Sequence, residues 1–355
     1  MLERFHVDKK IAVSVSKQKM ETTVEQIFLK IGFNKKDAKQ ATDVLIYSDI
    51  RGIESHGVSN MLREYVKSAN DGGINTNPKW KITKDFNAVC SINSDQGLGL
   101  VVGPHGMKEA IKRAKKFGIG AVNVYNSGHF GPAAYYAHMA VKENLVGFAT
   151  TTGGIGVAPT FGKTPMVGLN PLGFGAPTSK NPPFIFDAST SSVAGNKIKL
   201  AKRLNVKAMG GWISDSSGVP IMNETEIPDE YNILPLGGTR EIGSHKGYGL
   251  AVMLEIMTSI LSATGGGLGR RNGSAHHFIA YNIDAFSNLN DFIKDLDDYL
   301  DDLKKNPPVS GQERVVYAGL LEHETEIERE QNGIPYHPEV IDWFNSITSE
   351  LNIDW

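Results

Sequence analysis

The chain has 355 residues, of which 40% are hydrophobic and 21% charged, with a formal net charge of −2 at pH 7. This is an ordinary globular composition, and the near-neutral charge argues against nucleic-acid binding through bulk charge. A single cysteine, Cys90, excludes an internal disulfide and a cysteine-based zinc site.

No uncharged apolar run approaches the ~18 residues that a membrane span needs. The first part of the chain, residues 1–19, is too charged for a signal peptide. We therefore expect a cytoplasmic protein without a membrane partner. The length is sufficient for one large domain or two interleaved ones.

The first third of the chain is predicted to be mostly helical. Apolar side chains recur on one stripe over residues 22–31, and Asn34 is placed to cap a second helix. A polar break, Arg51-Gly-Ile-Glu-Ser-His-Gly57, precedes a third helix over Val58–Asn70. The first part of the chain is therefore expected to be a helical layer.

The middle of the chain contains a strand–loop–helix–strand unit. Apolar runs over Gly120–Tyr125 and Leu145–Thr151 predict strands, and Pro132–Glu143 predicts a helix. The loop between the first strand and the helix holds His129. Backbone N–H groups converge in such a loop, and an imidazole there can exchange a proton near neutral pH beside a bound anion. The alternative is a structural histidine that only caps the helix.

Further elements follow this pattern along the chain. A strand around Val89–Ile92 and a helix over Gly103–Phe117 precede the His129 unit. After it we expect short strands over residues 151–177, a strand over Phe184–Phe186 that ends at Asp187, a basic helix over Asn196–Leu204, an apolar helix over Tyr248–Ala263, a strand over Phe278–Ile283 and an amphipathic helix over Asn288–Lys305.

Standard functional fingerprints do not occur. The chain lacks a G-x-G-x-x-G after a strand, a G-x-x-x-x-G-K-[ST], a G-x-S-x-G and an H-E-x-x-H. The histidines show no metal-ligand spacing, so no metal site is predicted. Four polar clusters lie at breaks between apolar segments: Ser55-His56, His129, Asp187–Thr190 and His245–Gly249. Each also has a structural interpretation, such as a helix cap for Ser55 or a turn cap for Asp187.

Six stretches, in a fixed order, resemble a known family. They are Arg51-Gly-Ile-Glu-Ser-His-Gly57, Gly128-His-Phe-Gly131 with Tyr135-Tyr136, Gly168-Leu-Asn-Pro171, Phe186-Asp-Ala-Ser-Thr190, Leu234-Pro-Leu-Gly-Gly238 and Lys246-Gly-Tyr-Gly-Leu250. The series resembles the malate/L-lactate dehydrogenase family that lacks a Rossmann fold. That family also includes ureidoglycolate, sulfolactate and diketogulonate dehydrogenases and cyclic-imine reductases. The resemblance runs from about residue 20 to about residue 335.

The resemblance implies an α+β fold with a mostly antiparallel sheet, a helical N-terminal part and a non-Rossmann dinucleotide-binding domain. It implies a discontinuous substrate domain over residues 1–120 and 250–355, and a cofactor domain over residues 121–249. Members of the family are usually homodimers, so a homodimer is expected here.

The resemblance further implies an NAD(P)-dependent oxidoreductase that interconverts a small 2-hydroxy acid and a 2-oxo acid by hydride transfer. His129 matches the proton donor and acceptor, and Ser55 and His56 match a pair near the substrate and the nicotinamide. We expect the helix start after His129 to depress its pKa. The positions that match dinucleotide contacts are Ala133, Ala134, Tyr135, Asp187, Ala188, Ser189, Lys246 and Gly319.

The choice between NAD and NADP stays open at this point. Asp187 can accept a hydrogen bond from a ribose hydroxyl, which favours NAD. A basic patch that follows it can favour the 2′-phosphate of NADP, although a solvated helix face is the simpler interpretation. The patch consists of Lys197, Lys199, Lys202 and Arg203. NAD is the expectation.

One departure from the family pattern concerns the substrate carboxylate. The family often has an arginine five residues after the serine, where this chain has Asn60, and there is one extra residue before Tyr65. Gly128 also stands where many members have asparagine. We therefore hypothesise that Arg63 binds the carboxylate, assisted by His56, with Asn60 and Tyr65 also near the substrate. Alternatively, Asn60 contacts an uncharged group.

Two other functions are compatible with the same residues. One is NAD(P)H-dependent reduction of a cyclic imine carboxylate. The other is a catalytically inactive protein that binds a dinucleotide or has a regulatory role, against which intact His129, Asp187 and Lys246 argue.

Overall fold

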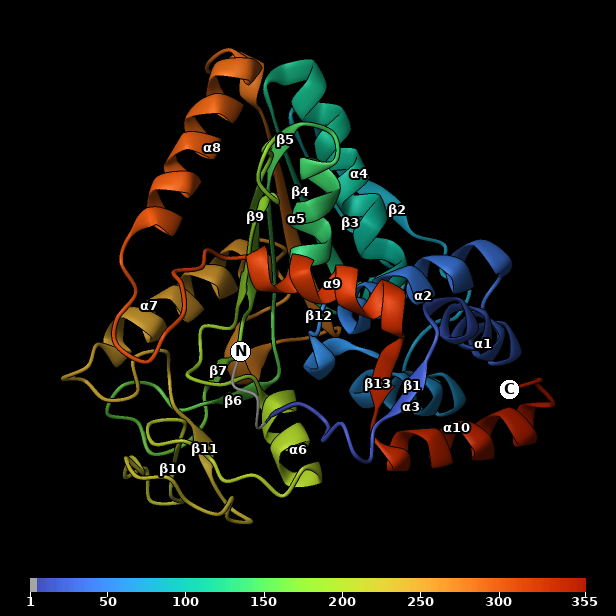
Figure 1. Ribbon diagram of the computed structural model, residues 1–355. Coiled ribbons are helices and arrows are strands. Elements are labelled where there is room, and N and C mark those ends of the chain that lie inside the picture. The colour runs from blue at the N-terminus through green and yellow to red at the C-terminus, as the bar shows by residue number, and fades with distance from the viewer. Residues whose placement is uncertain (1–4) are drawn as a thin grey trace.

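A seven-stranded sheet organises the chain, whose computed structural model describes residues 5–355 (Figure 1). In spatial order its strands are β2 (Lys81–Phe86), β3 (Val89–Asn93), β4 (Ile119–Ser127), β12 (Ser274–Asn282), β5 (Leu145–Thr151), β8 (Leu172–Ala176) and β9 (Phe184–Ala188). Only β3 and β4 pair in parallel, and the other neighbours pair antiparallel. The predicted mostly antiparallel sheet is therefore confirmed.

Helices cover both faces of this sheet. Helices α4 (Gly99–Phe117) and α5 (Ala133–Val141) pack on one face (Figure 1). Gly120 of β4 lies so close to α4 that an added Cβ would be 2.0 Å from the Ala110 carbonyl oxygen. Asn123 points the opposite way, because side chains alternate along a strand. Its amide donates to the Thr258 carbonyl at 3.1 Å, in the π-helical turn Ile256–Ile260 that follows α7 (Ser244–Glu255).

The predicted helical layer is present at the N-terminal side. It contains α1 (Lys17–Lys30), α2 (Lys35–Ile50) and α3 (Val58–Asn70), with α10 (Pro338–Leu351) packed against α1. Asn34 caps α2 as expected, since its Oδ1 accepts from the Asp37 N–H at 3.1 Å. A two-stranded sheet of β1 (Val13–Val15) and β13 (Ile334–Tyr336) joins the two ends of the chain.

A smaller β region lies below the central sheet in Figure 1. Its strands are β10 (Ile213–Ser214), β11 (Asn232–Ile233), β6 (Ile155–Val157) and β7 (Val167–Gly168), in that order. The remaining helices are α6 (Gly195–Arg203), α8 (Leu289–Lys305) and α9 (Leu320–Asn332), with short turns at Glu54–His56, Gly267–Gly269 and Ile283–Ala285. No helix within residues 5–355 is long and apolar enough to cross a membrane.

Two helices start earlier than their sequence pattern predicts. Helix α4 begins at Gly99, where an added Cβ would be 2.7 Å from the carbonyl oxygens of Gly128 and His129, so its first turn packs on the His129 loop. Helix α7 begins at Ser244, after Gly243 with φ of 113°. The glycines of its first two turns lower helix propensity, which is why the apolar pattern indicated a later start.

Candidate functional site

A cavity of about 720 Å³ lies where the central sheet, the helical layer and the smaller β region meet. This volume is typical of a site for a small molecule or cofactor. Its wall comes from the Glu54–His56 turn, the His129 loop, the end of β9, the start of α6 and the segment before α9. The predicted residues on it are Ser55, His56, His129, Ala134, Asp187, Ala188, Ser189 and Gly319. Segments far apart in the sequence therefore meet at one cavity.

His129 is held by hydrogen bonds to one nitrogen of its ring. The Tyr65 hydroxyl lies 2.7 Å from Nδ1, and the Gly131 N–H donates to the same atom at 3.3 Å. Gly131 has φ of 78°, a left-handed conformation that glycine adopts readily and that turns its amide back toward the ring. Because Nδ1 accepts, the neutral ring carries its proton on Nε2.

The pKa of His129 is far below that of a free histidine. The pKa is lowered to about 3, mainly by burial and to a smaller extent by the neighbouring His56, His276 and Lys199. The predicted direction is confirmed, but the predicted cause, the helix start, is not the main one. At pH 7 the ring is therefore neutral.

Ser55 and His56 lie beside His129. The rings of His56 and His129 stack with centroids 5.7 Å apart and an interplanar angle of 13°. The Ser55 hydroxyl lies 2.9 Å from His56 Nδ1. Burial lowers the pKa of His56 to about 4, so this ring is also neutral at pH 7. The three side chains form a compact neutral group that can donate and accept hydrogen bonds.

A buried network holds the turn that carries this pair. The Asp49 carboxylate accepts from the Val58 N–H at 3.1 Å and from the Tyr336 hydroxyl at 2.7 Å, so it caps α3 from the preceding helix. The Arg329 guanidinium bonds the Glu54 carboxylate at 2.7 Å and the Asp49 carbonyl oxygen. Both charged partners are buried, and both sides of the Ser55–His56 turn are fixed.

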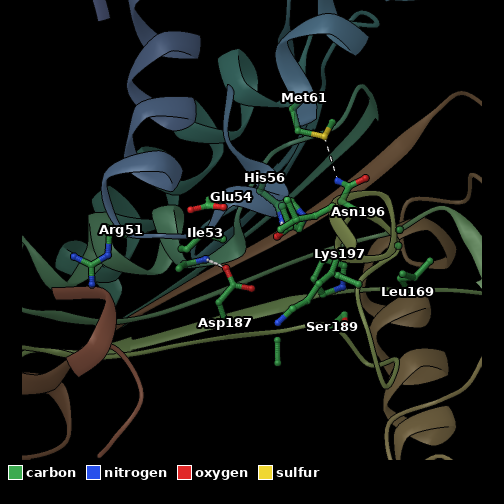
Figure 2. A pocket seen from close by; sticks show the side chains of 18 of the residues that line it. Arg51, Ile53, Glu54, His56, Met61, Leu169, Asp187, Ser189, Asn196 and Lys197 are labelled. Carbon is green, nitrogen blue, oxygen red and sulfur yellow. Dashed lines mark hydrogen bonds between the residues drawn. The ribbon is translucent and has the colours of Figure 1, made fainter. Parts of the chain in front are cut away.

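Asp187 lies at the end of β9 with its carboxylate open to the cavity. Its Oδ2 accepts from the Ala134 N–H at 2.7 Å, so it caps α5, the helix that follows the His129 loop (Figure 2). The surrounding protein raises the pKa of Asp187 above its usual range, mainly by burial. Asp187 therefore caps a helix, where the sequence indicated the cap of a turn, and it also lies on the cavity wall.

The structure does not bring Arg63 to the cavity, contrary to the hypothesis that it binds the carboxylate. Its guanidinium bonds the Glu339 carboxylate at 3.2 Å and lies over the Trp343 ring, both on α10. The reason is helical phase: Met61 and Tyr65, one turn apart, face the site, and position 63 lies about 200° round the helix from position 61.

Other predicted residues also lie outside the cavity. Tyr65 is buried behind His129. Asn60 is buried, donates to the Glu54 carbonyl at 3.2 Å and accepts from Arg203 at 2.9 Å. Lys246 is exposed in the first turn of α7 and, like Ala133 and Tyr135, is not part of the cavity wall. Lys246 is therefore a solvated residue at the start of α7.

Several residues of the wall were not predicted as site residues. They are Phe5, His6, Arg51, Thr151, Thr152, Asn196 and Lys197. Lys197 was interpreted as part of a solvated basic helix face, because nothing in its spacing separates it from Lys199 and Lys202. Among residues 5–355, no group of three or more His, Cys, Asp or Glu side chains could hold a metal ion.

Comparison with known proteins identifies the relatives of this fold. A model of the malate/L-lactate dehydrogenase family matches residues 15–345. A malate dehydrogenase from Pyrococcus abyssi is 36% identical over 362 residues, covering 99% of both chains. An L-sulfolactate dehydrogenase from Methanocaldococcus jannaschii is 32% identical and covers 92% of this chain and 94% of its own.

A solved structure agrees with these sequence matches. The malate dehydrogenase of Entamoeba histolytica superposes with a TM-score of 0.92 at 32% identity, over 97% of this chain and 99% of that one. The mixed α/β fold described above is therefore shared along almost the whole length. The chain belongs to the malate/L-lactate dehydrogenase family.

Proposed function

We propose that this protein is an NAD(P)-dependent oxidoreductase that interconverts a small 2-hydroxy acid and its 2-oxo acid. The main supporting observation is His129: it is neutral, its Nδ1 is engaged, and it lies on the wall of a cavity of about 720 Å³. The names of the relatives support the same reaction class. A nicotinamide dinucleotide supplies or accepts the hydride when bound.

The wall of the cavity fits such a cofactor. The Asp187 carboxylate is open to the cavity and can accept from a ribose hydroxyl, and the backbone at Ser189 and Gly319 lines the same side. An added Cβ at Gly154 would meet nothing within 4 Å, which leaves open space beside the backbone there. The contacts proposed here are therefore Ala134, Asp187, Ala188, Ser189 and Gly319, in a site without a Rossmann fingerprint. Ala133, Tyr135 and Lys246 are not needed for it.

His129 moves the proton in this proposal. In the direction of oxidation, the neutral ring takes the tautomer in which Nδ1–H donates to the Tyr65 oxygen, Nε2 accepts the hydroxyl proton, and the ring becomes a cation. In the direction of reduction, this cation gives its Nε2 proton to the carbonyl oxygen of the 2-oxo acid, where negative charge develops, and the ring returns to the neutral form. Ser55 and His56 hold the substrate through neutral hydrogen bonds. Tyr65 is a positioning residue, since it acts through His129.

The cofactor is proposed to be NAD. Two of the four basic side chains of α6 pair with carboxylates, Lys199 with Glu64 and Arg203 with Glu339, and Lys202 lies over the Tyr231 ring outside the cavity wall. They are therefore less available to a 2′-phosphate. We further propose that residues 121–249 provide most of the contacts to the cofactor. Strand β12, which belongs to the 250–355 part of the expected substrate domain, nevertheless lies between β4 and β5 in the central sheet.

The experiment that tests the function is a substrate panel with the purified chain. Oxidation of NADH and NADPH is followed at neutral pH with the 2-oxo acids of malate, lactate and sulfolactate, and with a piperideine carboxylate. Reduction of NAD is followed with ureidoglycolate. Turnover of a 2-oxo acid or 2-hydroxy acid supports the proposal. Turnover of the cyclic imine alone would establish the reductase alternative instead.

The same preparation tests the inactive alternative. A ligand that binds only the folded state must raise the melting temperature. A rise with NADH and no turnover on any substrate of the panel would identify a protein that binds a dinucleotide without catalysis. The absence of a rise with either dinucleotide would contradict the cofactor site proposed above.

A further inference from the structure

The charges on the cavity wall are not balanced at one position. Besides its histidines, the wall carries three basic side chains, Arg51, Lys197 and Lys199. Arg51 pairs with Glu326, and Lys199 pairs with Glu64 at 3.3 Å. Within residues 5–355, no carboxylate lies at ion-pair distance from the Lys197 ammonium, and no charged neighbour shifts its pKa. Among the residues that the structure describes, Lys197 is therefore the basic side chain of the cavity wall that has no carboxylate partner.

The environment of Lys197 makes the lack of a carboxylate partner unusual. Its side chain is half-buried, and its Nζ lies over the Phe5 ring, 5.0 Å from the centroid. Burial lowers the pKa of the ammonium. A lysine is seldom withdrawn from water without a partner, because desolvation of the charge is unfavourable. The aromatic contact offsets part of this cost. An anion that enters the cavity and pairs with the ammonium would offset more of this desolvation cost.

Helix α6, which carries Lys197, packs against α3. Asn196 donates to the Met61 sulfur at 3.2 Å, and Lys199 and Arg203 bond residues of the same helix, α3. That helix also holds Tyr65 behind His129. Figure 2 shows His56, Asn196, Lys197 and Asp187 among the side chains that line the cavity. The start of α6 has no side-chain cap, so the positive end of the helix adds to the field of the lysine.

We propose that Lys197 binds the carboxylate of the substrate. This inference rests on the proposed function, and it fills the role that the sequence pattern gave to Arg63, whose guanidinium is engaged by Glu339. An ammonium is a compact point charge without the planar fork of arginine. The site is therefore expected to require a free carboxylate on the substrate. The phosphates of the dinucleotide are the other anions that enter this cavity, and the experiment below separates the two.

The test compares Lys197→Met with Lys197→Arg and with Lys202→Met. Lys202 is the matched control, because it lies on the same helix but outside the cavity wall, over the Tyr231 ring. For each variant we measure KM for the best 2-hydroxy acid, and by calorimetry the Kd of oxalate, an unreactive carboxylate probe, and of NADH. Lys197→Met should raise KM and the oxalate Kd by about 10- to 100-fold, the scale of a lost charge-assisted hydrogen bond.

The remaining arms decide the assignment. NADH affinity should change less than about twofold, well below the effect of a lost charge-assisted bond. Lys197→Arg should recover part of the oxalate affinity, and Lys202→Met should behave as the wild type. If Lys197→Met weakens NADH binding and leaves oxalate binding unchanged, the anion is the dinucleotide phosphate and the proposal is overturned. It is also overturned if neither affinity changes.

Failure of the proposed function gives a different result. A wild type that turns over no 2-hydroxy acid, yet binds oxalate through Lys197, would refute the proposed function and keep the carboxylate site. Lys197→Gln replaces Lys197→Met if the latter loses the native melting transition.

Discussion

His129 is the residue on which the proposed chemistry depends. Its ring is already neutral at pH 7 and its orientation is fixed by contacts to Nδ1. We expect His129→Asn to keep the fold and NADH affinity but to reduce kcat by about 10²–10⁴-fold, the usual contribution of a general acid–base group. Steady-state kinetics and an NADH titration measure both quantities. Near-normal turnover at neutral pH would reduce His129 to a structural role.

A substitution at Tyr65 tests whether this residue positions His129 or binds the substrate. The sequence pattern placed it near the substrate, whereas its hydroxyl lies 2.7 Å from His129 Nδ1 and its side chain is buried. Tyr65→Phe removes one neutral hydrogen bond, so kcat should fall by about 2- to 10-fold with little change in KM. The pH profile of kcat should also shift, because the Nδ1 partner influences the proton affinity of the ring. A rise in KM alone, with an unchanged pH profile of kcat, would show that Tyr65 binds the substrate instead.

The residues that sequence reasoning found share one property. They are polar side chains that follow apolar runs at the ends of helices or strands, so they stand out in the sequence. These residues are Ser55, His56, His129 and Asp187. Arg63 and Lys197 lie within helices, and their surroundings depend on which helix packs beside them. The pattern of α3 cannot reveal that α10 supplies Glu339, and the pattern of α6 cannot reveal that a cavity lies at its start.

At the scale of elements, the start of α3 depends on a close approach. An added Cβ at Gly57 would be 1.7 Å from Asp49 Oδ1, the atom that with its partner oxygen caps the Val58 N–H. The φ of Gly57 is −89°, which any residue can adopt, so the contact alone demands glycine. The Asp49 cap and the Ser55–His56 turn therefore share one steric constraint.

Gly57→Ala should lower the free energy of unfolding by about 1–3 kcal/mol, within the range for overpacked or cap-losing mutations. Turnover should fall as well, because the Ser55–His56 turn must move. Gly269→Ala is the matched control: it lies in the short Gly267–Gly269 turn away from this cap, and nothing lies within 4 Å of its added Cβ. Urea unfolding of the two variants measures the difference. Equal stability of both would contradict the cap geometry.

Element boundaries were predicted well where local patterns decide them. Helix α3 and strand β5 have the predicted limits, because apolar periodicity and polar flanks agree there. Helix α4 extends to Gly99 only because the His129 loop packs on its first turn. The central sheet also joins β12 to β4 and β5, which are more than a hundred residues earlier in the chain. Such pairings are long-range and leave no local pattern.

At the scale of the whole molecule, one apolar surface lies outside the core. Five side chains of α7 and the π-helical turn after it recur at helical spacing and are exposed: Leu250, Met253, Ile256, Ile260 and Leu261. The opposite side of the same segment packs on β4, β5 and β12. A continuous apolar stripe of this kind is typical of a protein–protein interface. We propose that it is the two-fold interface of the expected homodimer, in which a stripe on one chain meets the same stripe on its partner.

Ile256→Asp should therefore dissociate the dimer. Ile256 is 50% exposed in the single chain, so the charge is tolerated in a monomer but would be buried against its own copy at the interface. Light scattering should give twice the 38.6 kDa chain mass for the wild type and the chain mass for the variant. Val309→Asp, a change at a 74% exposed apolar residue outside the stripe, should stay dimeric. A monomeric wild type at micromolar concentration, or a dimer that Ile256→Asp leaves intact, would rule out this interface.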